Sequence, residues 1–129
     1  MITEDYVSFE VAKLLKEKGF DEPCYSSYKK GVFSLDSYMM TNVEFNNNAV
    51  SAPTLQIAMK WLREVHKLYI ELVLNQDIEY EDAVIENYYF FNVSRIDRFT
   101  NEGGDYKSYK SYEEACEAAI KYCLTNLIK

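Results

Sequence analysis

Glycine, proline and histidine are scarce in this chain of 129 residues, which has four glycines, two prolines and one histidine. The scarcity of glycine and proline excludes collagen-like sequences and long flexible linkers. With one histidine, no site that needs two imidazoles can form within a single chain. The three cysteines are an odd number and make a poor disulfide framework.

Basic residues are also scarce. The chain has 14 basic and 21 acidic residues, which gives a net charge of −7 and an isoelectric point near 4.7. A phosphate backbone repels such a domain unless its basic residues cluster, so we do not expect nucleic acid as a partner. No apolar run approaches the roughly 18–20 residues that span a bilayer. The acidic N-terminal residues do not resemble a signal peptide. We therefore expect a cytoplasmic protein without a membrane partner.

Aromatic residues are abundant, with 12 tyrosines and seven phenylalanines. The chain is 48% apolar and 27% charged, which is ordinary for a globular protein. A chain of this length buries about two-thirds of the surface of its unfolded form, enough for one core. We therefore predict a single globular domain over residues 1–129.

Two segments in the first half of the chain have helical apolar spacing and clear end signals. The first begins after Ser8, a good N-cap, and ends at Gly19, which suits a left-handed C′ position with Phe20 folding back on Leu15. The second begins after Pro53. Its predicted buried stripe is Leu55, Ala58, Met59, Leu62 and Val65.

A third helix is predicted near the C-terminus, where Ser111 and Glu114 form a capping-box sequence. Glu117 and Lys121 are spaced for an ion pair along it. The stripe predicts that Cys116 and Cys123 are buried as small hydrophobic residues. Its members are Ala115, Cys116, Ala119, Ile120, Cys123, Leu124, Leu127 and Ile128.

Strand patterns occupy the rest of the chain. Residues 66–75 alternate between apolar and polar, which predicts a strand with one buried face. Residues 87–95 are apolar on both faces and predict a more central strand. Weaker alternation over residues 25–45 predicts two short strands joined around Asp36-Ser37. A further strand is expected over 106–110, after a turn at Asn101-Glu102-Gly103-Gly104.

This order of elements predicts an α+β fold. The connection between the two clearest strands contains no helical pattern, so a parallel crossover is not expected there. We expect an antiparallel sheet of about three to five strands, with three helices packed mainly on one face.

Motifs for catalysis, metal binding and cofactor binding are absent from the sequence: there is no glycine-rich phosphate loop, nucleophile elbow or paired metal-ligand motif. A Cys–His pair remains formally open, with His66 as the base and Cys24 as the cysteine that no helical stripe explains. A structural role for both residues is favoured. We therefore predict a protein that is not an enzyme and has no cofactor or metal.

An acidic run from Asp77 to Glu86 holds five carboxylates and no base. A solvated connection is the favoured interpretation. A docking surface for a basic partner and a weak divalent-cation site are the alternatives, and the cation site lacks the glycine of a tight calcium loop. The carboxylates of this run are Asp77, Glu79, Glu81, Asp82 and Glu86.

Several tyrosines fall outside the predicted core stripes and are interleaved with lysines. Half-burial at a sheet edge is the favoured explanation. A protein interface, where tyrosine is enriched, comes second, and stacking on nucleic-acid bases comes third. With the acidic run, four of them complete the candidate interaction surface: Tyr25, Tyr28, Tyr106 and Tyr109.

The three helical segments, residues 6–20, 51–64 and 111–124, resemble a family of small uncharacterised proteins from gut anaerobic bacteria, their prophages and their mobile elements. Each carries recognisable motifs, such as Ser-Ala-Pro-Thr at 51–54 and Ser-Tyr-Glu-Glu-Ala at 111–115. The family has no assigned activity or catalytic residues. The resemblance therefore implies a setting, phage or mobile-element cargo, without a mechanism.

The leading hypothesis is a non-enzymatic accessory protein of such an element that acts by binding another protein, with a homo-oligomer possible. One alternative is an acidic DNA mimic or anti-defence protein, which requires carboxylates gathered on one surface. The other is an enzyme that uses Cys24 and His66.

Overall fold

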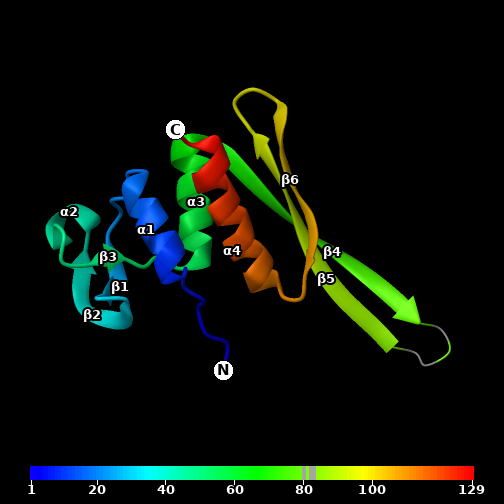
Figure 1. Cartoon of the computed structure of the whole chain (residues 1–129), viewed down its shortest axis with the longest axis horizontal. Coiled ribbons are helices and arrows are strands. Elements are labelled where there is room, and N and C mark those ends of the chain that lie inside the picture. Colours follow the sequence, from blue (N-terminus) through cyan, green and yellow to red (C-terminus); the bar gives the residue numbers. More distant parts are fainter. Residues whose placement is uncertain (80, 82–83) are drawn as a thin grey trace.

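Three long helices lie between two antiparallel sheets (Figure 1). The computed structural model describes residues 1–79, 81 and 84–129, with Tyr106 described by its backbone alone. In chain order the elements are α1 (Phe9–Glu17), β1 (Cys24–Lys29), β2 (Val32–Met40), α2 (Asn42–Phe45), β3 (Val50–Ser51), α3 (Leu55–His66), β4 (Leu68–Glu79), β5 (Val84–Arg95), β6 (Thr100–Tyr109), α4 (Tyr112–Tyr122) and the π-helical turn η1 (Cys123–Leu127).

The α+β prediction is confirmed, and all the strand pairs are antiparallel. The strands divide into two sheets, with the orders β2-β1-β3 and β4-β5-β6. The division arises because each hairpin pairs locally, while α3 separates the first three strands from the last three along the chain. The predicted central position of β5 is confirmed.

The ends of α1 follow the predicted signals. The Ser8 hydroxyl accepts a hydrogen bond from the Val11 N–H, and Gly19 has a φ of +94°. The Phe20 N–H donates to the Leu15 carbonyl at 2.9 Å, which closes the helix as a Schellman motif.

The ion pair predicted within α4 is replaced by contacts with α1. Glu117 accepts a hydrogen bond from the Ser8 N–H at 3.1 Å, and Lys121 pairs with Glu10 at 2.8 Å. Because the N-terminus of α1 is electropositive, the Glu117 carboxylate is better placed there than beside Lys121. These contacts fasten the two helices to each other.

The stripe on α3 differs from the prediction. Trp61 is 6% exposed and packs against Phe20, with ring centroids 5.3 Å apart, whereas Val65 is 54% exposed. The helix turns its indole inward because Phe20, at the end of α1, provides an aromatic surface there. Across α4 and η1 the predicted stripe is confirmed from Ala115 through Leu124, including the burial of Cys116 and Cys123.

One core joins both sheets to the helices. Its largest fully buried side chains come from the segment preceding α1, from α1 and the residue closing it, from α3 and α4, and from β4, β5 and η1. They are Val7, Val11, Leu15, Phe20, Leu62, Leu68, Phe91, Val93, Cys116, Ile120, Cys123 and Leu124.

The turn between β1 and β2 lies at Lys30-Gly31, so its predicted position at Asp36-Ser37 is wrong. Lys30 and Gly31 both have positive φ, +53° and +78°, as a two-residue hairpin turn of type I′ requires. Asp36 lies within β2 and pairs with Lys29 at 2.7 Å. The pairing of β1 with β2 shifts register between Leu35 and Met40, so the polar Asp-Ser pair lies in an irregular part of the strand.

Residues 77–79 and 84–86 are exposed, as a solvated segment should be, but they belong to strands, so the prediction of a connection is wrong there. β4 continues to Glu79 and β5 begins at Val84, and the pairs Asp77↔Glu86, Ile78↔Ile85 and Glu79↔Val84 are in register. The alternation of apolar residues continues through Ile78, and cross-strand pairing follows it despite the acidic composition.

The predicted turn at residues 101–104 lies within β6. The register between β5 and β6 shifts between Asn92 and Ser94, and Gly104 sits against the Phe91 carbonyl. Gly103 and Gly104 therefore permit a bulge and a close approach of the two strands. The turn comes earlier, over residues 96–99.

Candidate functional site

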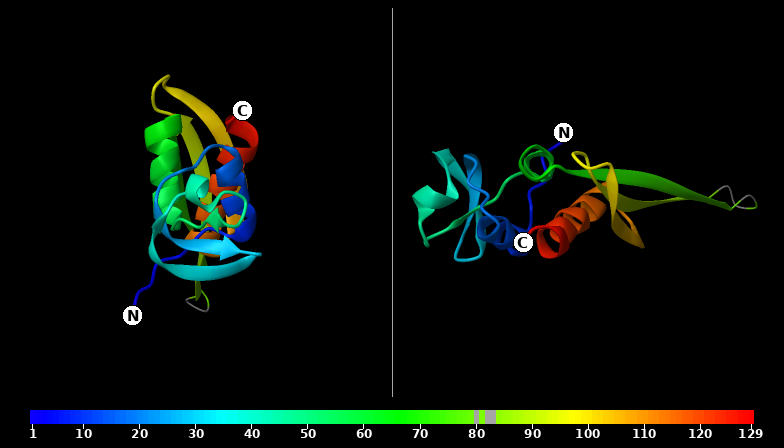
Figure 2. Two further views of the ribbon diagram at one scale, coloured as in Figure 1. Left: turned by 90° about the vertical axis from the view of Figure 1, so that its left-hand side faces the viewer. Right: turned by 90° about the horizontal axis from the view of Figure 1, so that it is seen from above.

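The end of the β4–β5 hairpin projects beyond the helices (Figures 1 and 2). We call residues 75–79 and 84–88 the hairpin arm. Strand β6, the third strand of this sheet, does not extend along the arm, because it pairs only with residues Tyr89 to Arg95 of β5. In the described part of the chain, no strand pairs with the outer edges of the arm. The arm therefore has two open edges and two uncovered faces.

The two faces of the arm differ in chemistry, since residues directly opposite in the ladder share a face. The pair Ile78↔Ile85 lies on the face that, nearer the core, carries Leu72↔Phe91. This face continues the core surface past the end of the helices. Ile78 is 50% exposed and Ile85 is 58% exposed.

The other face of the arm is acidic. Asp77 and Glu86 lie directly opposite each other, and Glu79 follows on the same face beside Val84. Like charges in directly opposed positions destabilise an antiparallel ladder. The Glu86 carboxylate accepts a hydrogen bond from the Tyr88 hydroxyl, and this bond raises the pKa of Tyr88.

The structure brings the predicted acidic residues together and leaves the tyrosines apart. Asp77, Glu79, Glu81 and Glu86 lie on or beside the arm, and Asp82 lies outside the described residues. The four candidate tyrosines divide between two sheets: Tyr25 and Tyr28 lie in β1, and Tyr106 and Tyr109 lie in β6.

Two of these tyrosines have structural partners. Tyr28 donates to the Val7 carbonyl at 2.7 Å, and Tyr109 donates to the Asp105 carboxylate at 2.8 Å. Burial, reinforced by that hydrogen bond, raises the pKa of Tyr109 to about 12. Tyr25 is 57% exposed. The candidate residues that the structure describes therefore divide between the two sheets.

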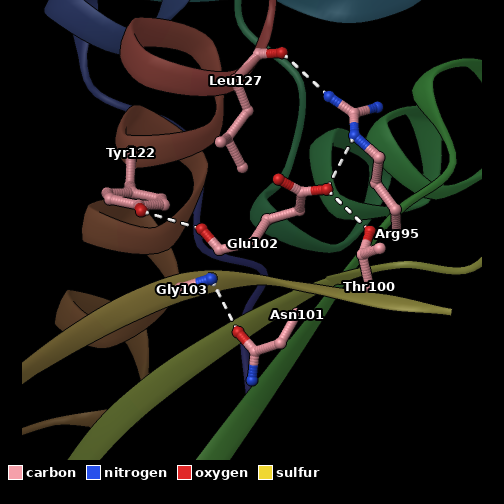
Figure 3. A network of polar contacts seen from close by, with 7 residues as sticks. All are labelled: Arg95, Thr100, Asn101, Glu102, Gly103, Tyr122 and Leu127. Carbon is pink, nitrogen blue, oxygen red and sulfur yellow. Dashed lines mark hydrogen bonds and ion pairs between the residues drawn. The ribbon is translucent and has the colours of Figure 1, made fainter. Parts of the chain in front are cut away.

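A polar cluster at the opposite end of β5 has a structural role (Figure 3). Arg95 pairs with Glu102 at 3.1 Å and donates to the Leu127 carbonyl at 3.1 Å, while Tyr122 donates to the Glu102 carbonyl at 3.0 Å. These bonds join β5, β6 and the π-helical turn. The guanidinium supplies a donor to a carbonyl at the end of that turn, where helical carbonyls lack partners.

Cys24 and His66 occupy structural environments. The Cys24 thiol donates to the Glu22 carbonyl at 3.5 Å, and burial raises its pKa to about 11. A nucleophilic cysteine needs the opposite shift, toward the thiolate. The His66 ring packs against Trp61 at 4.7 Å, and its Nε2 has no hydrogen-bond partner among the described residues.

His66 predicts a specific pH dependence of stability. Burial, with a smaller contribution from Arg95, lowers its pKa below 6.5, so the folded protein favours the neutral ring. The unfolded chain then binds the proton more readily, and the stability contributed by neutral His66 is lost as the pH falls below 6.5. We expect the single imidazole NMR signal to titrate below pH 6.5. His66→Phe should remove this component from the pH profile of unfolding, and an unchanged profile would contradict the assignment.

Among the residues that the structure describes, no helix is both long and apolar enough to cross a membrane. No group of three or more histidine, cysteine, aspartate or glutamate side chains in that part of the chain is arranged to hold a metal ion.

Comparisons with known proteins add no assignment. The chain matches no protein-family model, and neither the curated proteins nor the solved structures give a match. The resemblance of the helical segments to proteins of gut anaerobes therefore stays an expectation.

The sequence patterns missed the apolar side of the arm. Ile78 and Ile85 were hidden within a run noted for its carboxylates. The available signal was the position of Ile78, an even number of residues after Leu72 and Leu74. This spacing places it on the same face of a strand and extends the alternation beyond residue 75.

Proposed function

We propose that this chain is a non-enzymatic protein-binding module whose hairpin arm docks on a basic partner protein. The observation that carries the proposal is a projecting hairpin with an isoleucine pair on one face and opposed carboxylates on the other. A prophage or mobile-element setting is part of the proposal and rests on the resemblance of the helices.

Three features of the free arm are unfavourable, and a partner would relieve each of them. A two-stranded hairpin without a third strand is marginally stable in water. Burying the exposed isoleucines against a partner lowers the free energy of the system. The facing carboxylates Asp77 and Glu86 repel each other until a cation lies between or beside them. These features favour a partner with an apolar groove bordered by lysine or arginine.

Charge also bears on which partner is favoured. A second copy would bring the same carboxylates to the interface, and charged edge strands are a common protection against such pairing. A DNA mimic needs a surface dominated by carboxylates, whereas the arm combines Asp77, Glu79 and Glu86 with branched apolar residues. We therefore favour a different, basic protein with an apolar groove.

Two substitutions test opposite faces of the arm in a binding assay. Asp77→Lys places opposite charges across the ladder and is expected to raise the free energy of unfolding by roughly 0.2–1 kcal/mol, while it weakens capture of the partner about tenfold. Ile78→Ser removes apolar contact and should weaken capture by about tenfold or more. The measurement compares partners captured from host-cell extract by the full chain, with affinities then determined for the purified partner.

Matched variants on α3 serve as controls, because Glu64→Lys and Ile57→Ser make the same changes at exposed positions of that helix. Both should bind like the unmodified chain. Amide hydrogen exchange should slow in the arm when the partner is bound. Equal binding by the arm variants and the controls would overturn the proposal, as would a partner that protects only other elements.

A further inference from the structure

A lysine-lined pocket lies at the end of the molecule opposite the arm. It has a volume of about 300 Å³ and is formed by α1, the β1–β2 turn and the loop between α2 and β3. Three lysines line it, Lys13, Lys16 and Lys30, together with Asn47 and Asn48. Among its described lining residues there is no carboxylate.

This composition reverses the charge balance of the chain. The chain as a whole carries 21 acidic residues against 14 basic ones. The larger pocket between α1 and α4, of about 580 Å³, is lined by five carboxylates, with Lys121 as its one lysine among the described residues. Glu10 of α1 pairs with Lys121, and Asp36 of β2 pairs with Lys29.

The lysines are held by different means. Lys16 donates to the Asn46 carbonyl at 2.7 Å, and the Lys13 ammonium lies 4.6 Å from the centre of the Phe9 ring. The Phe9 ring also contacts Tyr28, with centroids 5.4 Å apart, and forms an apolar wall beside the ammonium groups. An ammonium group has three donors, so Lys16 keeps donors free for a ligand.

Lys30 is the least expected residue of the pocket. It has a φ of +53° at the first position of the turn, where asparagine, aspartate or glycine is favoured. Within the described residues its ammonium has no ion-pair or hydrogen-bond partner. A lysine kept in an unfavourable backbone conformation, beside two others and with no partner, fits a residue retained for binding.

We propose that this pocket binds a small phosphate monoester whose organic part rests against Phe9. A dianionic phosphate matches a pocket lined by three lysines and no carboxylate, and asparagine side-chain amides are further donors that its oxygens can accept from. A pocket of this volume suits a small molecule with an apolar wall and a few polar groups. The site is independent of the hairpin arm and does not rest on the function proposed for it.

The test is an NMR titration of the full chain with phenyl phosphate and, separately, with inorganic phosphate. We expect saturable shifts of amide signals at residues 13, 16, 30–31 and 47–48, with phenyl phosphate binding more tightly. Lys13→Met should weaken binding about tenfold. Lys60→Met, which removes a lysine from the exposed face of α3, should leave it unchanged.

Lys30→Asn separates a binding role from a structural one. Asparagine suits the turn better, so this variant should melt at the same or a higher temperature while it binds phenyl phosphate about tenfold more weakly. Shifts that do not saturate, or that change equally in the Lys60→Met control, would overturn the proposal. Binding of an acidic peptide without binding of either phosphate compound would also overturn it.

Discussion

Replacing Phe91 with alanine is expected to lower the free energy of unfolding by about 3–5 kcal/mol, a large part of the 5–15 kcal/mol typical of a protein of this kind. Phe91 is 1% exposed at the centre of β5, and its ring contacts those of Tyr109 and Tyr122 at 6.3 and 5.7 Å. Truncation removes apolar burial and leaves a cavity between the sheet and α4. Urea unfolding followed by circular dichroism measures the loss.

Phe99→Ala is the matched control for Phe91→Ala. Phe99 is 100% exposed in the turn before β6, so the same chemical change there should alter the free energy of unfolding by no more than about 0.5 kcal/mol. Similar losses for the two variants would contradict the assigned position of Phe91 in the core.

Gly104→Ala is expected to cost about 3 kcal/mol and to loosen the pairing of β5 with β6. A Cβ at this position would lie 2.3 Å from the Phe91 carbonyl oxygen and 3.1 Å from the Asn92 Cα. Both are backbone atoms of the central strand, so the strain cannot be relieved by a side-chain rotation. The strands must separate at the bulge.

Amide hydrogen exchange along β5 and β6, together with urea unfolding, measures the effect of Gly104→Ala. Gly19→Ala provides the comparison, because Gly19 has a φ of +94° but no atom within 4 Å of the added Cβ. Its cost should be limited to backbone strain of about 1–2 kcal/mol. Unchanged exchange in β6 of Gly104→Ala would contradict the close approach of the strands.

The sequence predicted the helices well because their signals are local. The N-cap at Ser8, the closing Gly19 and the apolar spacing that buries Cys116 and Cys123 each depend on residues within one or two turns. Local signals were weaker where a residue had alternative partners. Glu117 was spaced for Lys121 but contacts Ser8, which became available only when α1 packed beside α4.

The candidate site was predicted in part. The composition of the run identifies its acidic residues. Only the strand register shows that they extend β4 and β5 and that Asp77 lies directly opposite Glu86. A turn and a bulge both attract glycine and asparagine, so the sequence could not distinguish the turn expected at 101–104 from the bulge at Gly104.

The sequence by itself determined the α+β class, the three long helices and the absence of familiar catalytic motifs, because these depend on spacing along the chain. The tertiary structure alone decided the division into two sheets, the arm that projects past the third strand, and the lysine pocket. These features depend on where strands end relative to one another and on which distant residues meet. Such contacts are fixed by packing of the whole chain, and spacing along it carries little information about them.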